Sequence, residues 1–275
     1  HAYEGFDFNN IILEMVHFFD DEILVAASVN FSSSNDVSDV ALMRINTDGE
    51  LIWQKIIDYG SIEYARGLVV IEDGIILAYK QKGANDQFEF IRLVKYDFDG
   101  NFQWESNPFW DECNLGDLQL SKDGFLIGGG CLSNNDNGGD MALTKFDSEG
   151  NQLWTRTYGL PDNLEVAYKI AVDDHNRIIA TGRTETNTEN IADILLIKTN
   201  CMGLMTYPEA QFDFEELNEN EILFENFSQF IYPDSIDGGH YIWDFGDGNF
   251  SSAINPSHSY ETEGTYEVTL TAIVC

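Results

Sequence analysis

The sequence has few basic residues for its length. Its 275 residues include 14 Lys and Arg against 48 Asp and Glu, which gives a formal net charge of −34. A field of that sign repels nucleic acid phosphates and the headgroups of anionic lipids. The acidic residues are spread through predicted loops and turns, which favours a solvated, self-repelling surface over one specific acidic site. We therefore expect neither a nucleic-acid partner nor insertion into a membrane.

Long apolar runs and closely paired cysteines are also missing. No apolar run reaches the roughly 18 residues of a membrane helix, and the opening "HAYEGFDFNN" has neither the basic segment nor the apolar core of a signal peptide. The four cysteines contain no CxxC pair, which argues against a zinc or thioredoxin-like centre. Cys113 and Cys131 flank a predicted hairpin, so a disulfide between them and two buried thiols both fit. Cys201 and Cys275 have no obvious mates.

The common catalytic fingerprints are absent as well. The sequence contains no HExxH, GxSxG, P-loop or dinucleotide-binding motif, and its five histidines lie far apart. Pairs of carboxylates occur throughout so acidic a chain, so they do not identify a glycosidase. We therefore expect a protein that is not an enzyme and that uses no organic cofactor.

The sequence does contain a repeat of about 50 residues. Residues 41–53 (ALMRINTDGELIW), 91–104 (IRLVKYDFDGNFQW) and 141–154 (MALTKFDSEGNQLW) align directly. In each segment a glycine is followed four residues later by a tryptophan, and a fourth copy has tyrosine instead. The four pairs are Gly49 and Trp53, Gly100 and Trp104, Gly150 and Trp154, and Gly203 and Tyr207.

A second repeated unit lies between these segments, at residues 18–28, 70–80, 120–130 and 172–182. Each copy has turn residues followed by a β-branched apolar run that ends in small residues, which is typical of a hairpin entering a crowded place. Two hairpins in each period give four strands, and such a sheet must stack on its copies to bury both apolar faces. The sequence therefore predicts a β-propeller over residues 1–207, with four four-stranded blades that either close or belong to a larger ring.

The repeated aromatic residue is best interpreted as a docking residue that covers the join between neighbouring blades. A sugar-stacking platform is the functional alternative. A basic residue also recurs five positions before each repeat glycine, at Arg44, Lys95, Lys145 and Lys198. We expect its stem to lie on the sheet with its charge paired to a carboxylate, and a cationic ring around a binding channel is the alternative.

The spacing from glycine to tryptophan resembles the tryptophan-docking blades of quinoprotein-type and outer-membrane-assembly propellers. It is more similar still to the secreted propeller repeats of Bacteroidetes surface proteins. The resemblance covers residues 1–207 and implies a fold but no ligand. No residues match a quinone-binding site, so that cofactor is not expected.

Residues 208–275 break the period and alternate as short strands, which predicts a separate β-sandwich. The segment 241–260 (YIWDFGDGNFSSAINPSHSY), followed by GTYEVTL at 264–270, resembles the PKD domain, an immunoglobulin-like sandwich named for polycystic kidney disease protein. In this resemblance Trp243 fills the core, Gly246 and Gly248 allow unusual backbone angles, and Tyr266 occupies a tyrosine corner. The remaining structural positions are Pro256, His258 and Tyr260. Pro256 fixes an extended entry to the next strand. A packed, hydrogen-bonded His258 is favoured over a catalytic base.

Calcium is the one cofactor that the residue pattern leaves open. Asp244 and Asp247 are candidate ligands, with stabilisation of the turn as the favoured alternative. Asp136 and Asp140 lie in "NNDNGGD", which has a calcium-like composition but lacks the ligand spacing of an EF-hand.

These features together favour a non-catalytic adhesion or recognition module of a larger secreted or cell-surface protein. Its expected partner is a protein or a glycan. One alternative is the subunit of a surface filament, which would self-associate. Another is an accessory binding or spacer region of a secreted protease or polysaccharide-degrading enzyme. The resemblance also implies a Bacteroidetes-type exported protein that uses the type IX secretion route.

Overall fold

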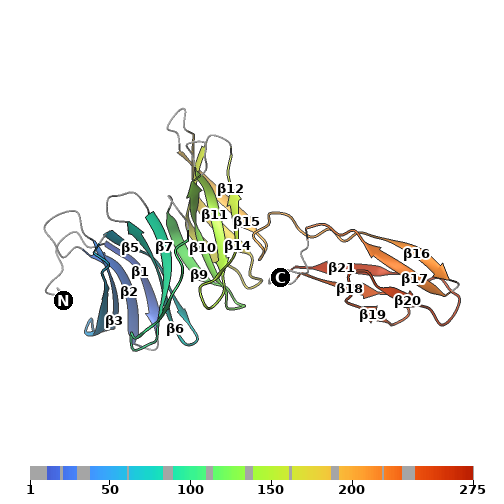
Figure 1. The fold of residues 1–275 in the computed structure, drawn as a ribbon, viewed down its shortest axis with the longest axis horizontal. Helices are drawn as coiled ribbons and strands as arrows, with labels where there is room; N and C mark the ends of the chain where they lie inside the picture. The colour runs from blue at the N-terminus through green and yellow to red at the C-terminus, as the bar shows by residue number, and fades with distance from the viewer. Residues whose placement is uncertain are drawn as a thin grey trace. The chain divides into compact units, whose positions relative to one another are not determined.

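The computed structural model is all-β throughout the residues that it describes (Figure 1). The described residues are 11–18, 21–29, 38–60, 62–82, 89–109, 114–133, 139–160, 163–186, 192–218, 220–230 and 239–274. Within those ranges the chain forms no helix that is long and apolar enough to cross a membrane.

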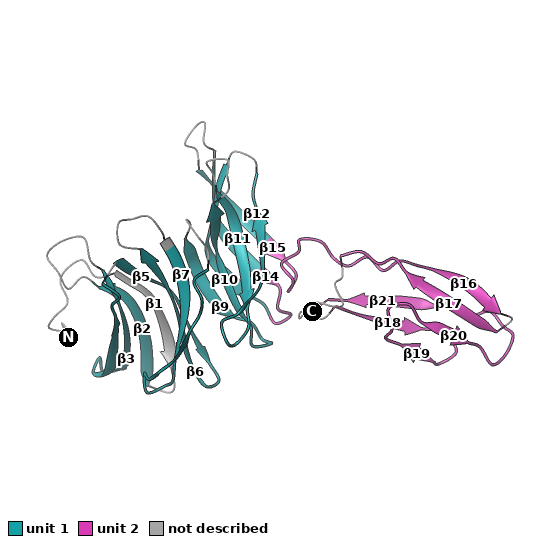
Figure 2. Cartoon of the chain, in the orientation of Figure 1, with its two compact units in different colours: residues 1–173, 179–197 teal, residues 174–178, 198–275 magenta. Residues whose placement is uncertain are grey.

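The chain divides into two compact units (Figure 2). Unit 1 comprises residues 1–173 and 179–197, and unit 2 comprises residues 174–178 and 198–275. The chain therefore passes from unit 1 to unit 2 after residue 197, whereas the end of the repeat predicts a boundary between residues 207 and 208. Asn200 shapes this part of the chain, because its Oδ1 accepts hydrogen bonds from the backbone amides of Met202 and Leu204, at 3.0 and 2.9 Å.

Unit 1 begins with two four-stranded antiparallel sheets in which neighbours in sequence are neighbours in space. The first sheet has the order β1 (Ile11–Phe18), β2 (Glu22–Val29), β3 (Asp39–Asn46) and β4 (Leu51–Ile57). The second has the order β5 (Ile62–Ile71), β6 (Gly74–Lys82), β7 (Glu89–Tyr96) and β8 (Phe102–Glu105). Both are the double hairpins that the repeat predicts.

The third repeat forms the same meander, and the fourth stops short of it. The third comprises β9 (Leu115–Leu120), β10 (Leu126–Ser133), β11 (Gly139–Phe146) and β12 (Gln152–Tyr158), and the fourth comprises β13 (Asn163–Val172), β14 (Ile178–Thr186) and β15 (Ala192–Thr199). A parallel pair, Gly139 with Leu164, links β11 to β13. Residues 203–207, where a fourth strand was expected, form bends and coil, so that expectation is wrong here. The side chain of Tyr207 is 70% exposed, so this segment buries little apolar surface that would hold it as a strand.

The sheets of unit 1 bury their apolar faces against one another. Leu24 and Leu42 of the first sheet share a core with Leu68 and Leu77 of the second. A second core joins the second and third sheets; it includes Val69, Ile76, Leu93, Leu118, Ala142 and Phe146. Stacking removes both faces of a sheet from water, which a single sheet cannot do.

The small residues that end the repeated hairpins do lie in crowded places. A Cβ atom on Gly129 would be 2.4 Å from Cγ2 of Ile170, which belongs to the neighbouring repeat. One on Gly182 would be 1.7 Å from the carbonyl oxygen of Val166. Only glycine allows the strands to approach so closely.

Among its described residues, unit 2 contains two three-stranded sheets (Figure 1). One has the order β16 (Phe212–Asn218), β17 (Glu221–Asn226) and β20 (Ser257–Ser259), and the other has the order β19 (Phe250–Ser251), β18 (His240–Asp244) and β21 (Thr269–Ile273). Both sheets contribute to a single aromatic core around Trp243, which is fully buried. The indole Nε1 donates a hydrogen bond to the carbonyl oxygen of Ala253 at 2.9 Å, so the polar edge of the ring is also satisfied.

Two of the four cysteines lie in the described residues, and both Cys131 and Cys201 are disulfide-bonded. The free-thiol alternative for Cys131 is therefore wrong. Cys201, for which the sequence indicates no obvious mate, is bonded as well. Cys113 and Cys275 lie outside the described residues.

Candidate functional site

The repeat tryptophans lie against the turn glycines of the following repeat. A Cβ atom on Gly100 would be 3.3 Å from the Trp53 ring, and one on Gly150 would be 2.7 Å from the Trp104 ring. Nε1 of Trp53 donates a hydrogen bond to the carbonyl oxygen of Phe98 at 3.3 Å. Both glycines have positive φ, at 77° and 79°, so backbone conformation and space both require glycine there. These two indoles are half-buried and pack between repeats.

The last two repeat aromatics are Trp154 and Tyr207. The guanidinium carbon of Arg156 lies 5.6 Å from the centre of the Trp154 ring. The largely exposed Tyr207 shows no ring contact among the described residues. Gly49 and Gly203 keep positive φ, at 83° and 71°, so the turn recurs in all four copies.

The first three repeat cations pair with acids in the preceding turn or strand of their own sheet. Nε of Arg44 bonds to the carboxylate of Glu22. Nζ of Lys95 lies 2.7 Å from Oδ2 of Asp73, and Nζ of Lys145 lies 3.6 Å from Oδ2 of Asp123. Lys145 also sits 4.0 Å from the centre of the Phe125 ring. These contacts are the paired arrangement that the sequence favours, whereas Lys198 is exposed.

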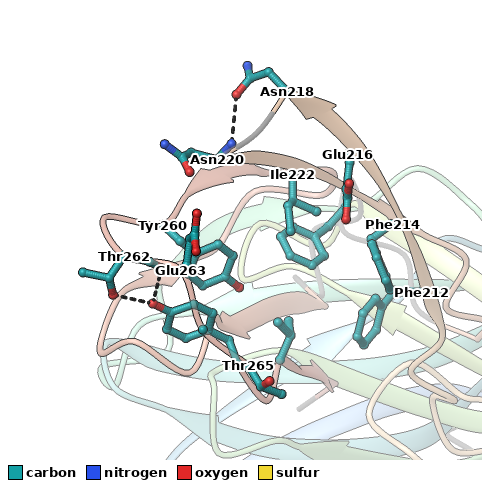
Figure 3. Close-up of a pocket in the computed structure, with 14 residues that line it drawn as sticks. Phe212, Phe214, Glu216, Asn218, Asn220, Ile222, Tyr260, Thr262, Glu263 and Thr265 are labelled. Atoms are coloured by element: carbon teal, nitrogen blue, oxygen red, sulfur yellow. Dashed lines mark hydrogen bonds between the residues drawn. The ribbon is translucent and has the colours of Figure 1, made fainter.

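Unit 2 has an open groove of about 540 Å³ between β16 and the segment 262–268 (Figure 3). Alternate residues of β16 line one wall, because side chains two apart on a strand share a face. These are Phe212, Phe214, Glu216 and Asn218. Phe224, Tyr260, Tyr266 and Val268 are aromatic or apolar lining residues as well.

The groove combines aromatic surface with polar groups. The Phe214 ring is 58% exposed. Glu216 and Glu263 contribute carboxylates, and Asn218 contributes an amide whose Oδ1 accepts a hydrogen bond from the Asn220 backbone at 3.2 Å. Aromatic faces bordered by acceptors and amides suit a sugar ring or a polar peptide segment.

The sequence motifs did not reveal this groove. Its signal in the sequence is the alternation of Phe212, Phe214 and Glu216 in β16. That alternation marks a face of the strand, but it does not tell whether the opposite sheet covers the face.

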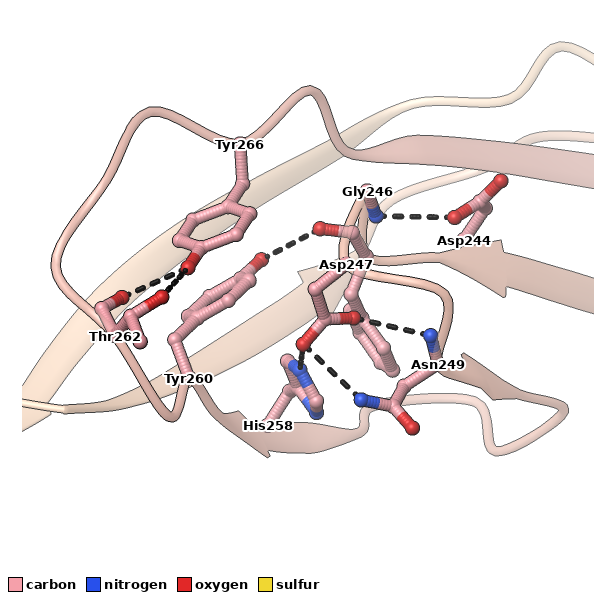
Figure 4. Close-up of polar contacts among 9 residues, drawn as sticks. Asp244, Gly246, Asp247, Asn249, His258, Tyr260, Thr262 and Tyr266 are labelled. Carbon is pink, nitrogen blue, oxygen red and sulfur yellow. Dashed lines mark hydrogen bonds and ion pairs between the residues drawn. The ribbon is translucent and has the colours of Figure 1, made fainter.

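The turn after β18 is built by its aspartates (Figure 4). Oδ1 of Asp244 accepts a hydrogen bond from the Gly246 amide at 3.0 Å, and Oδ1 of Asp247 accepts one from the Asn249 amide at 3.0 Å. Gly246 and Gly248 have φ of 78° and 90°. A Cβ atom on Gly246 would also be 2.5 Å from the carbonyl oxygen of Glu267. Glycine at position 246 is thus required by conformation and by space.

His258 is packed and hydrogen-bonded. Its ring stacks on Phe245 with centres 4.1 Å apart, and its Nε2 lies 2.7 Å from Oδ2 of Asp247. Burial acts to raise the pKa of Asp247, but hydrogen bonds from His258 and Asn249 outweigh burial and lower it to about 2. The pair therefore stabilises the turn with a charged carboxylate.

Two tyrosines close the end of the sandwich (Figure 4). The Tyr260 hydroxyl donates to the carbonyl oxygen of Phe245 at 3.0 Å. The Tyr266 hydroxyl donates to the carbonyl oxygen of Thr262 at 2.7 Å, which is the backbone hydrogen bond of a tyrosine corner. The two rings stack with centres 4.0 Å apart, so this wall of the groove is fixed from both sides.

Pro256 contributes a backbone hydrogen bond to the sandwich. It is buried, and its carbonyl oxygen accepts a hydrogen bond from the Phe224 amide at 2.9 Å. This bond joins the residue before β20 to β17 within one sheet.

The aspartates predicted as calcium ligands do not gather into a group of three ligands among the described residues. Asp244 and Asp247 are occupied by the turn hydrogen bonds above. Asp140 lies beside Gly159 near Glu165, and Asp136 lies outside the described residues. The described residues do contain a group that the sequence did not indicate, formed by Asp39, Asp58 and Glu63.

Comparison with known proteins identifies most of the second unit. Residues 208–273 match the family described as PKD domain, so this part of the chain is a PKD domain. A stretch of 30 residues, 11% of the chain, is 60% identical to "Collagenase ColQ1" of Bacillus cereus (strain Q1) and covers 3% of that protein. PKD domains are extracellular modules that mediate protein or carbohydrate interactions and often occur in secreted enzymes.

Proposed function

We propose that this protein is a non-catalytic recognition module of a larger secreted or cell-surface protein. The groove of the PKD domain is its ligand site, and the ligand is a glycan or a polar peptide segment. The observation that carries the proposal is an exposed aromatic ring, Phe214, in an open groove whose other wall is held by Tyr266 and Tyr260. Rigid aromatic anchors with nearby polar groups are typical of recognition sites.

We further propose that residues 1–207 are blades of a β-propeller. Three consecutive four-stranded meanders and the cores shared between neighbouring sheets support this fold. The indoles of Trp53 and Trp104 against the next turn support it as well. The last repeat exposes Ile194 (86%) and Leu196 (66%) on β15, which favours an arc of a larger ring over four blades closed on themselves.

The test of the ligand site is binding of the full chain to arrays of glycans and of extracellular matrix peptides. The variant Phe214→Ala removes the exposed ring, and we expect at least tenfold weaker binding, since aromatic anchors typically contribute about 2 kcal/mol or more. Phe250→Ala is the matched control, because Phe250 is 65% exposed in the same unit and does not line the groove. Equal binding by both variants, with unchanged melting temperatures, would place the ligand elsewhere.

The accessory region of a secreted enzyme is the second candidate. The similarity to a stretch of a collagenase favours it, because the chain spans only a small part of that protein. Collagen peptides therefore belong on the array, and binding to them alone would favour this role. A filament subunit, the third candidate, predicts concentration-dependent self-association in light scattering.

A further inference from the structure

The ends of three strands in unit 1 bring three carboxylates together. Asp39 begins β3 and Asp58 follows β4; these two ends are adjacent because Val40 pairs with Ile57. Glu63 is the second residue of β5, and its amide donates to the Ser38 carbonyl oxygen at 2.6 Å. The three side chains therefore meet where the first sheet adjoins the second.

The carboxylates are close enough to share one ion. One oxygen from each of the three lies within 4.8 Å of the others. Two oxygens bound to the same calcium ion, each at about 2.4 Å, are separated by no more than about 4.8 Å. The spacing therefore allows all three carboxylates to bind one ion.

Burial makes this arrangement costly without a cation. Asp39 is 6% exposed and Glu63 is fully buried, while Asp58 is exposed. Within the described part of the chain, Oδ1 of Asp39 is buried and accepts no hydrogen bond. Burial, and then the nearby charge of Asp58, raise the pKa of Asp39. A buried carboxylate oxygen with no donor, facing two further carboxylates, indicates a missing positive partner.

We propose that Asp39, Asp58 and Glu63 bind a calcium ion that stabilises the junction between the first two sheets. The donor set is oxygen only, which suits a hard cation and disfavours zinc. Calcium accepts irregular geometry and completes its shell with water, whereas magnesium demands near-ideal octahedral ligands. The exposed Asp58 gives the ion a path from solvent.

Other repeats provide an internal comparison. Asp140 and Glu165 stand at the positions of Asp39 and Glu63, because Gly139 pairs with Leu164 as Ser38 pairs with Ile62. The position of Asp58 corresponds there to Gly159, because Met141 pairs with Tyr158 as Val40 pairs with Ile57, so the third carboxylate is absent. In the second repeat Phe90 replaces the aspartate. We therefore expect one calcium site of this kind in the described residues.

The experiment is calorimetric titration of the full chain with calcium in 150 mM NaCl, a salt concentration that screens diffuse binding to the acidic surface. We expect saturable binding with a Kd of about 0.1 to 1 mM, the range of extracellular modules. Calcium at about ten times its Kd should raise the melting temperature of unit 1 by about 3 °C.

The variant Asp58→Asn tests the ligand set without disturbing the core. Its amide oxygen can still accept the hydrogen bond that Asp58 Oδ1 takes from Gly60 at 2.7 Å, and the lost charge should weaken calcium binding at least tenfold. Asp48→Asn is the matched control, because it removes one charge from an exposed turn of the same sheet. Equal affinities for the two variants, or no saturable binding at about 10 mM calcium, would overturn the proposal.

The variant Asp39→Asn provides a second test. With a bound ion, this change abolishes the calcium-dependent rise in melting temperature. If the carboxyl groups instead share a proton, wild type shows no such rise and Asp39→Asn is at least as stable in chelator. That outcome would assign the group a purely structural role.

Discussion

The two units hold themselves together in different ways. Unit 1 distributes its stability over successive joins between sheets, and the first two joins combine an apolar face, an indole and a turn glycine. Unit 2 concentrates its stability in one aromatic core, where Phe212, Phe224 and Phe245 surround Trp243. Stacked sheets with several similar interfaces should lose less stability when one contact is removed than a domain with a single core does.

Loss of the Trp243 ring should have the largest effect. Trp243→Ala removes a fully buried side chain and its hydrogen bond to Ala253, at a cost of about 4 kcal/mol. A small sandwich has little stability beyond that amount, so we expect the unit 2 transition to disappear from calorimetry. The unit 1 transition should remain. A single transition that shifts as a whole would show that the units melt together.

A turn glycine of unit 1 should have an intermediate effect. Gly150→Ala forces an alanine into φ of 79° and a methyl group to 2.7 Å from the Trp104 ring, so we expect a loss of roughly 3 kcal/mol. Gly124→Ala is the control, because Gly124 has φ of 84° with no atom near the added methyl. It should lose only about 1 kcal/mol. Equal losses in urea unfolding would mean that the contact with the indole is worth nothing.

The hydrogen-bonded pair in unit 2 should have the smallest effect. Because the folded pKa of Asp247 is lowered to about 2, its contribution is present above the unfolded value of about 3.9 and is lost as pH falls through about 2. The melting temperatures of Asp247→Asn and wild type should therefore converge as pH falls from 4.5 to 2. Glu225→Gln, an exposed charge change in the same unit, should show no such convergence. If the difference in melting temperature between Asp247→Asn and wild type stays constant across that range, the Asp247–His258 pair does not contribute to the pH dependence of stability.

Local patterns made part of this fold predictable. The turn glycines lie four residues before the repeat aromatics, and their positive φ is a local property of the hairpin. The segment around Trp243, Gly246 and Tyr266 identified the PKD domain, because residues close together in the sequence set its turn conformations. The meander order in the first three repeats also follows from short turns, which make sequential strands adjacent.

Contacts between distant residues were not predictable in the same way. The sequence predicted that the repeat cations pair with carboxylates. The register between strands determines that the partners are Glu22, Asp73 and Asp123. The missing fourth strand near Tyr207 depends on burial. Strand register and burial come from the packed fold and leave no local signal.

The amino-acid sequence by itself determined the repeated hairpins, the acidic surface and the sandwich motif, because these depend on residues close together in the chain. Only the tertiary structure decided which carboxylates meet at Asp39, Asp58 and Glu63, and that one face of β16 stays open beside Tyr266. The first feature arises where the ends of β3, β4 and β5 meet, and the second where β16 lies beside the segment 262–268; both depend on how the folded chain packs.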